Sequence, residues 1–371
     1  MVTTQVPFVD LAAQQAEILD AIRPQIDLIL TTGAFVGGRP VDDFESAYAN
    51  FIGVRHCVGV ANGTDALELA LRGVGLEGGG EVLVPANTFI ATAEAVVRAG
   101  GHPVFVDVDD DCLLMSPDAV KAAVGAQTRV VMPVHLYGQA APVEEITPWA
   151  VSVDAVLIED AAQSQGATRH GVAAGALGQV AGTSFYPGKN LGAAGDAGAV
   201  LTDDDELADR VRSLANHGSQ RKYEHDIIGF NSRMDAIQAV VLRAKLDRLA
   251  AWNAARARAA ARYEAMLAGI DGVRCPQVLA GNTHVWHLYV IRVPDRDRVL
   301  RALQAAGIGA GLHYPVPVHL TPAFRGWGYG PGDFPIAERA AQEILSLPMH
   351  PHLTSADQER VVEVLRGALE D

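Results

Sequence analysis

Residues 155–160 read AVLIED, and residues 184–192 read SFYPGKNLG. The first stretch is a short apolar run that ends in a carboxylate, Asp160, which is typical of a buried strand in an α/β sheet. The second holds Lys189, the one charged residue in the span 171–195. Small and aromatic neighbours hydrate an ammonium group poorly. We therefore expect a lowered pKa for the Lys189 amine, which makes it a nucleophile.

Lys189 and Asp160 together supply the two groups that an aldehyde cofactor such as pyridoxal phosphate requires. The amine forms a Schiff base with the aldehyde, and the carboxylate keeps the nitrogen of the pyridine ring protonated. Taken singly, each residue has an ordinary interpretation, as a solvated loop lysine and as the cap of a helix that begins at Ala161. Their common setting favours a cofactor site with Lys189 as its catalytic residue.

Short apolar runs alternate with helical patterns over the first 216 residues, which is typical of a doubly wound α/β sheet. The predicted strands are 56–60, 81–84, 103–107, 129–134, 155–159, 182–185 and 197–202. The predicted helices between them include 65–72, 91–99, 117–124 and 206–216. We therefore predict an α/β fold with a mostly parallel, buried central sheet.

The pattern changes at residue 234, where a helix rich in Ala, Leu and Arg is predicted to run to about residue 267. Further predicted elements are a strand at 286–293, a helix at 296–306, and a last helix opened by a capping box of Ser355 and Gln358. A chain of 371 residues usually exceeds a single core. We predict a large α/β domain over 1–250, which includes an N-terminal helical segment, and a small α+β domain over 251–371.

The charge balance argues against a nucleic-acid partner. Lys and Arg total 29 and Asp and Glu total 44, a formal net charge of −15, whereas phosphate binding along a nucleic acid needs clustered cations. Charged residues interrupt the N-terminal apolar pattern, which excludes a signal-peptide core there. No run approaches the roughly 18 apolar residues of a membrane span. We expect a cytoplasmic protein with no membrane association.

Cysteine and histidine patterns give no sign of a metal centre. The cysteines are Cys57, Cys112 and Cys275, which are far apart and form no CxxC pair, so neither a disulfide framework nor a zinc ribbon is indicated. The twelve histidines show neither an HExxH motif nor a Cys/His array. We predict no metal ion.

Three groups of residues follow predicted strands, at the edge where an open α/β sheet binds its ligands. Gly63 and Thr64 open a helix whose free amides and dipole suit a phosphate, although an ordinary helix cap has the same sequence. Phe89 offers an aromatic face for a flat ring, or else packs in the core. Asp160 and Gln163 would lie one helical turn apart, so Asp160 could meet the ring nitrogen and Gln163 the ring hydroxyl.

The chain resembles the DegT/DnrJ/StrS family of pyridoxal-phosphate sugar aminotransferases, which has the aspartate aminotransferase fold, known as fold type I. The similarity runs from Pro7 to Pro348, nearly the whole chain. Its markers are PFVDL at 7–11, NGTDAL at 62–67, EDAAQ at 159–163, SFYPGKN at 184–190 and GFNSR at 229–233. Five ordered motifs make this resemblance specific.

The resemblance implies a role for each marker residue. Lys189 looks like the Schiff-base lysine, Asp160 like the partner of the pyridinium nitrogen, and Phe89 like the residue that stacks on the ring. Three further residues look like phosphate ligands: Gly63, Thr64 and Ser184. Asn231 is expected to reach the cofactor phosphate of the other subunit, so the family implies a homodimer with shared active sites.

The resemblance also implies a ping-pong transamination with pyridoxamine phosphate as the intermediate form of the cofactor. L-glutamate is the expected amino donor, and a nucleotide-linked keto-sugar the expected acceptor. Segments 217–225 and 313–319, with Gly188, look like the branch that acts at C3 of dTDP-3-oxo-6-deoxyhexoses. The candidate substrate-binding residues are Tyr186, Arg221, Lys222, Tyr223, His313 and Tyr314. The cations among them suit a diphosphate and the rings suit sugar oxygens, although a solvated loop has the same composition.

Other functions on the same scaffold stay open at this stage. One is an aminotransferase acting at C4 of a nucleotide-linked 4-keto-6-deoxyhexose, and another is a pyridoxal- or pyridoxamine-dependent sugar dehydratase. A third is a non-catalytic regulator. Some dehydratase relatives carry a histidine in place of Lys189, and a regulator is expected to have a damaged lysine or aspartate. Because both residues are present, the sequence favours transamination.

Overall fold

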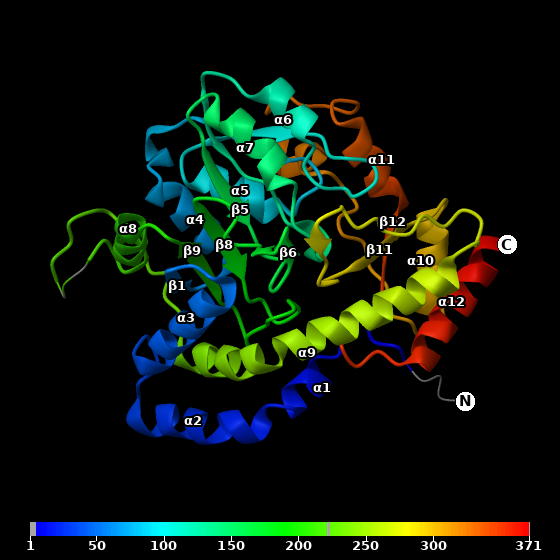
Figure 1. Cartoon of the computed structure of the whole chain (residues 1–371), viewed down its shortest axis with the longest axis horizontal. Coiled ribbons are helices and arrows are strands. Elements are labelled where there is room, and N and C mark those ends of the chain that lie inside the picture. Colours follow the sequence, from blue (N-terminus) through cyan, green and yellow to red (C-terminus); the bar gives the residue numbers. More distant parts are fainter. Residues whose placement is uncertain (1–4, 220, 222, 371) are drawn as a thin grey trace.

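The structure of the chain is a computed structural model that describes residues 5–219, 221 and 223–370. Its centre is a seven-stranded sheet in the order β1-β9-β8-β5-β4-β2-β3 (Figure 1). These strands are β1 (His56–Val60), β2 (Glu81–Pro85), β3 (His102–Val106), β4 (Thr128–Val131), β5 (Val156–Asp160), β8 (Val180–Ser184) and β9 (Gly198–Thr202). Only β9 runs against its neighbours. The predicted mostly parallel sheet is confirmed, and each predicted run overlaps one strand.

Helices cover both faces of this sheet. The flanking helices are α3 (Arg39–Ile52), α4 (Gly63–Gly73), α5 (Ile90–Arg98), α6 (Pro117–Ala123), α7 (Val143–Val151) and α8 (Asp205–Ala215). Side chains alternate along each strand, so Leu157 belongs to the hydrophobic cluster with α6 and α7 while its neighbour Ile158 belongs to the cluster with α4, α5 and α8. The sheet is therefore buried on both sides, and its ligand-binding edge lies at the ends of its strands.

A second, smaller core lies at the other end of the molecule (Figure 1). It is built from the antiparallel pair β11 (Tyr289–Arg292) and β12 (Ile344–Leu347), with α10 (Arg296–Ala305) and α12 (Ser355–Glu370). Val6, near the N-terminus, is buried in the same core. The predicted strand at 286–293 is confirmed in its second half.

The remaining elements connect or support these two cores. They are α1 (Leu11–Ala16), α2 (Leu19–Thr32), α11 (Pro335–Glu343), the short strands β6 (Thr168–Arg169), β7 (Val172–Ala173) and β10 (Asn282–Thr283), and the 3-10 turns η1 (Leu76–Gly78), η2 (Leu136–Gly138), η3 (Val318–Leu320) and η4 (Pro322–Phe324). Helix α2 packs through Ile22 and Ile29 against the long helix α9 (Ala236–Leu267).

Helix α9 spans the predicted domain boundary near residue 250. Its first half packs on the large core, for example through Leu242 and Leu249, whereas Tyr263 and Leu267 pack in the small core. One long, Ala-rich helix therefore fixes the two cores relative to each other. The segment containing Val318 and Phe324 returns to the large core. The boundary itself stays a prediction.

The capping box predicted for the last helix is wrong by one residue. Thr354 is the cap: its Oγ1 accepts a hydrogen bond from Asp357 N at 3.1 Å, and Asp357 Oδ2 accepts from Thr354 N at 3.3 Å. Gln358 instead donates to Ala259 O at 2.8 Å from a fully buried position. Thr354 and Asp357 have the same three-residue spacing as Ser355 and Gln358, and Gln358 cannot take part in a cap because its side chain faces α9.

A buried carboxylate next to the predicted site fixes the loop that leads back into the sheet. Glu159 is fully buried and accepts hydrogen bonds from the amides of Gly175, Leu177 and Gly178, each at 2.7 Å. His135 Nε2 is a fourth donor at 2.7 Å, because its Nδ1 already accepts from the Ala141 amide. Four donors on one carboxylate leave no place for an amide NH₂ group.

We therefore expect Glu159→Gln to destabilise the fold by about 3 kcal/mol, because the new NH₂ group would face two N–H donors in a buried site. Urea unfolding monitored by circular dichroism measures the change. Asp247→Asn is the control: Asp247 is 67% exposed in its ion pair with Arg243, and its loss should change the unfolding free energy by less than about 0.5 kcal/mol. Equal changes in the two variants would contradict this account of Glu159.

Candidate active site

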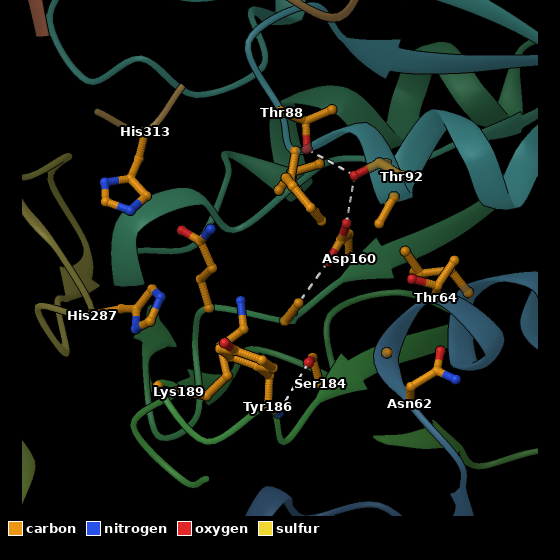
Figure 2. Close-up of a pocket in the computed structure, with 18 of the residues that line it drawn as sticks. Asn62, Thr64, Thr88, Thr92, Asp160, Ser184, Tyr186, Lys189, His287 and His313 are labelled. Atoms are coloured by element: carbon orange, nitrogen blue, oxygen red, sulfur yellow. Dashed lines mark hydrogen bonds between the residues drawn. The ribbon is translucent and has the colours of Figure 1, made fainter. Parts of the chain in front are cut away.

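A cavity of about 700 Å³ opens at the carboxyl ends of β1, β2, β5 and β8 (Figure 2). This is the edge at which open α/β sheets bind ligands. Both Lys189 and Asp160 line it, although 28 residues separate them in the sequence. The parallel alignment of β5 with β8 brings Asp160 level with Gly182, two residues before the strand ends. The structure therefore brings this amine and this carboxylate into one cavity, and their roles stay a prediction.

A tight turn after β8 presents the lysine to the cavity. The Lys189 amide donates to Tyr186 O at 2.8 Å, and the amine points into the cavity (Figure 2). Burial lowers the pKa of the Lys189 amine to about 8, and the nearby Asp160 carboxylate opposes part of that shift. A substantial fraction of the amine is therefore neutral, and nucleophilic, near pH 7 to 8.

Asp160 is buried at the end of β5 and is held by two donors. Thr92 Oγ1 donates to its Oδ2 at 2.7 Å, and the Ala162 amide donates to its Oδ1 at 3.1 Å (Figure 2). Thr88 in turn contacts Thr92, oxygen to oxygen, at 2.7 Å. Burial raises the pKa of the Asp160 carboxyl, while the hydrogen bond from Thr92 opposes that shift. A cation on the open side of this carboxylate would be strongly favoured.

The predicted helical turn between Asp160 and Gln163 does not exist, because the chain leaves β5 in successive turns. Gln163 still lines the cavity. Its Oε1 accepts from the Tyr137 amide at 2.7 Å, and its Nε2 donates to the Tyr314 hydroxyl at 3.1 Å. The expected juxtaposition with Asp160 therefore comes from loop hydrogen bonds, not from helical spacing.

The N-terminus of α4 forms another wall of the cavity. Asn62 caps this helix by accepting from the Asp65 amide at 2.8 Å, and Gly63 and Thr64 follow it. A Cβ atom at Gly63 would lie 2.5 Å from Ser184 Cβ, so only glycine allows the helix to come this close to β8. Free backbone amides, a helix dipole and two hydroxyl side chains suit a phosphate group.

Phe89 lies at the mouth of the cavity with half of its surface exposed. Its ring is 5.2 Å from the ring of Tyr314 at an angle of 36°, so the pair leaves an aromatic face open to the cavity. The alternative interpretation of Phe89 as a core residue is wrong. Asp160 and Phe89 thus line the same cavity. This is required if Asp160 is to contact the nitrogen of a pyridine ring and Phe89 is to stack on the same ring.

Only part of the predicted substrate set lies in this cavity within one chain. Tyr186, His313 and Tyr314 line it. Arg221 and Tyr223 lie outside its lining, on an exposed loop in which the Tyr223 side chain is 83% exposed. The predicted Lys222 lies outside the described residues.

Asn231 also lies outside the cavity of its own chain. It is exposed, and its Oδ1 accepts from Arg233 Nε at 3.1 Å. A single chain therefore does not bring Asn231 to the site, and its role stays a prediction that depends on a second subunit.

Two cavity residues beside Lys189 and Asp160 were not predicted. Thr92 is in the first turn of α5, and its position after Phe89 at the end of β2 could have suggested it. His287 precedes β11 in the small core, and no local pattern marks it as a cavity residue. Residues that reach a site from a distant segment carry no local signal in a single sequence.

The described part of the chain contains neither a helix able to cross a membrane nor a cluster of metal-ligating side chains. Within residues 5–219, 221 and 223–370, none of the helices has the length and apolar character that a membrane crossing requires. Nor do those residues bring three His, Cys, Asp or Glu side chains together in an arrangement for a metal ion. All three cysteines are free thiols.

The model of the DegT/DnrJ/EryC1/StrS aminotransferase family matches residues 17–366, almost the entire chain. The chain belongs to this family. The match confirms the resemblance drawn from the five motifs, and it makes the chain an aminotransferase by family. It also explains why an amine, a carboxylate, an aromatic face and a helix N-terminus meet in one cavity.

Known members of the family resemble the chain over its full length. A dTDP-3-amino-3,4,6-trideoxy-α-D-glucose transaminase of Streptomyces venezuelae is 43% identical over 98% of this chain and 96% of its own. A UDP-N-acetyl-3-dehydro-α-D-glucosamine 3-aminotransferase of Acidithiobacillus ferrooxidans is 44% identical over 99% and 98%. The crystal structure of S. venezuelae DesV with a ketimine intermediate superimposes with a TM-score of 0.97, at 43% identity and full coverage of both chains. The predicted fold class is confirmed.

Proposed function

We propose that the chain is a pyridoxal-phosphate aminotransferase that moves an amino group from L-glutamate to C3 of a nucleotide-linked 3-keto-sugar, a dTDP-3-oxo-6-deoxyhexose, in the biosynthesis of amino-deoxysugars. The observation that carries this proposal is the placement of Lys189 and Asp160 in one cavity with the Phe89 ring and the N-terminus of α4. Each of these groups matches one part of the cofactor.

The residues present fit pyridoxal phosphate. Asp160 would meet the ring nitrogen, Phe89 would stack on the ring, and Gln163 would face the ring hydroxyl. The phosphate would lie at the α4 N-terminus with Gly63, Thr64 and Ser184, where the absence of a Cβ on Gly63 lets the helix approach Ser184 closely. When bound, the cofactor supplies an aldehyde carbon that takes up an amino group and a ring that withdraws electrons from it.

Lys189 performs the proton transfers in this mechanism. Its amine would hold the cofactor covalently and, once free, would act as the base that takes the proton from the Cα of the amino donor and as the acid that returns it. The same amine serves the reverse steps with the keto-sugar. A pKa of about 8 suits this work, because a base and acid pair is most effective when its pKa is near the operating pH.

The choice of a C3 keto-sugar is supported by the names of the two relatives, both of which specify position 3 of a hexose. On the protein side, Tyr186, His313 and Tyr314 offer hydroxyl and imidazole groups for the sugar oxygens. The second candidate substrate is a UDP-linked N-acetyl-3-keto-hexosamine, because the relative that acts on it is equally similar to this chain.

A homodimer completes the proposed site. Asn231, Arg221 and Tyr223 would reach the cavity of the partner subunit, where Asn231 would meet the cofactor phosphate and Arg221 a diphosphate. We place the enzyme in the cytoplasm, where nucleotide-linked sugars are made. Size-exclusion chromatography with light scattering tests the dimer, and a monomer that aminates the sugar at full rate would contradict the shared site.

Absorption spectroscopy with mass analysis of the product tests the function itself. Glutamate should bleach the band of the protein-bound cofactor, near about 410 nm, and dTDP-3-oxo-6-deoxyglucose should restore it and become aminated at C3. Recovery of the absorption band only with the UDP-linked N-acetyl-3-keto-hexosamine would select the second candidate. A sugar product that has lost one water molecule and carries no new amino group would instead indicate a dehydratase.

Substitution of Gly63 tests the phosphate cradle. In Gly63→Ala, the new methyl group would lie 2.5 Å from Ser184 Cβ, so the α4 N-terminus must move and the dissociation constant for pyridoxal phosphate should rise by about ten-fold or more. Titration of the absorption band measures it. Gly125→Ala is the control, because a Cβ there meets nothing within 4 Å. Unchanged affinity in Gly63→Ala would place the phosphate elsewhere.

A further inference from the structure

His287 forms part of the cavity wall beside Lys189, and the proposed function gives it no task (Figure 2). It lies in the segment that precedes β11, and the residue is 9% exposed. A buried histidine at a reaction site is either a packing element or a hydrogen-bonding group with a fixed orientation. The side chains around it decide between these two.

A ladder of side-chain amides leads to His287 and fixes the direction of every hydrogen bond in it. Asn253 Nδ2 donates to Gln165 O at 2.9 Å, which leaves Asn253 Oδ1 to accept from Asn190 Nδ2 at 2.9 Å. Asn190 Nδ2 also donates to Val285 O at 2.9 Å. Backbone carbonyls can only accept, so both amides are oriented unambiguously and Asn190 Oδ1 faces His287.

The ladder therefore determines the tautomer of His287. Its Nδ1 lies 3.2 Å from Asn190 Oδ1, an acceptor, so Nδ1 carries the proton. Burial lowers the pKa of His287 well below its ordinary value, and the nearby Lys189, Arg256, His313 and His284 lower it further. The ring is neutral, and Nε2 presents a lone pair with no hydrogen-bond partner among the described side chains.

We propose that His287 is a positioning residue for Lys189: rotation of the lysine side chain within the shared cavity would bring its free amine to donate a hydrogen bond to His287 Nε2. Among the described contacts, Lys189 Nζ has no hydrogen bond of its own, although it ends a flexible four-carbon chain. A proton carrier acts efficiently only when it is held near the reacting atom. This inference rests on the proposed function, because it assigns the partner of the proposed proton carrier.

Two variants of nearly equal shape isolate the acceptor. In His287→Gln, the amide can donate to Asn190 Oδ1 through Nε2 and accept from Lys189 through Oε1, whereas His287→Met fills similar space with no such acceptor. In the cofactor-free full chain, competitive acetylation across pH, read by peptide mass spectrometry, measures the apparent pKa of the Lys189 amine. An ammonium gains more from an acceptor than an amine does, so the pKa should be lower in His287→Met than in His287→Gln.

In the holoenzyme, a single turnover with glutamate deuterated at Cα should separate the same two variants. We expect the rate to fall about ten-fold or more in His287→Met relative to His287→Gln, with a larger isotope effect and an unchanged affinity for glutamate. A purely structural role would affect both variants equally, so equal pKa values and equal rates would overturn the proposal. A wild-type enzyme that takes no amino group from glutamate would refute the proposed function, while the pKa comparison would still test the contact.

Discussion

Replacement of Lys189 by alanine should abolish transamination, with a fall in the rate of amino transfer of about 10⁴-fold or more. The variant loses the covalent anchor and the proton carrier together, and within the described residues the other cavity side chains contain no second primary amine. The measurement is a single turnover in which enzyme loaded with cofactor is mixed with glutamate and followed by absorption. Added methylamine should restore a small part of the rate, because it replaces the base but not its placement.

Lys245 provides the matched control for Lys189. Burial lowers its pKa to about 8 as well, but its Nζ donates to Gly192 O at 2.8 Å and lies outside the cavity. Lys245→Met should therefore keep the rate of amino transfer within about two-fold. If Lys245→Met lost activity as Lys189→Ala does, the role assigned to the cavity lysine would be wrong. A lowered pKa alone does not identify a catalytic lysine; the position of the amine does.

The strands, and Lys189 and Asp160 as candidate site residues, could be predicted from sequence because their signals are local. A buried parallel strand is a short apolar run, and the polar residue that ends it lies at the ligand edge, as Asp160 does at the end of β5. Lys189 was marked by the absence of other charges around it. Both signals survive in a single sequence, since neither depends on a distant segment.

Contacts between distant segments could not be predicted in the same way. Which of two overlapping capping boxes forms at the last helix depends on Gln358 facing α9, and the place of Gln163 depends on the Tyr137 amide. His287 lies in a segment that Asn190 holds at the cavity through Val285 O and His287 Nδ1. In each case the sequence allows several local arrangements, and packing across the two cores selects one of them.

Replacement of Asp160 by asparagine should lower the rate of amino transfer by about 10²- to 10³-fold, because an amide does not keep the ring nitrogen protonated. Cofactor binding should weaken as well, since the carboxylate is the charged partner of the ring. Rapid-mixing absorption measurements with glutamate give the rate. A loss of less than about five-fold would show that the ring nitrogen does not depend on Asp160.

The same substitution should stabilise the cofactor-free protein, because burial raises the pKa of Asp160 above its value in the unfolded chain. The folded state then binds the proton more tightly, so stability is full below the unfolded pKa and is lost as pH rises through the folded pKa. At pH values above the folded pKa the wild type carries this penalty and Asp160→Asn does not. Its melting midpoint should exceed that of the wild type by an amount on the order of 2 °C, and the difference should vanish toward pH 4.

Glu159→Gln, at the preceding residue, should instead lower the melting midpoint, because the Glu159 carboxylate already accepts four hydrogen bonds. Added pyridoxal phosphate should reverse the order for Asp160: the wild type gains a cationic ring nitrogen as partner for its buried carboxylate, and Asp160→Asn gains none. A cofactor-induced rise in melting temperature that is equal in both proteins would mean that this carboxylate does not meet the ring. Of these two adjacent buried carboxylates, Glu159 accepts all its hydrogen bonds from the protein, whereas Asp160 faces the cavity and can bind a ligand.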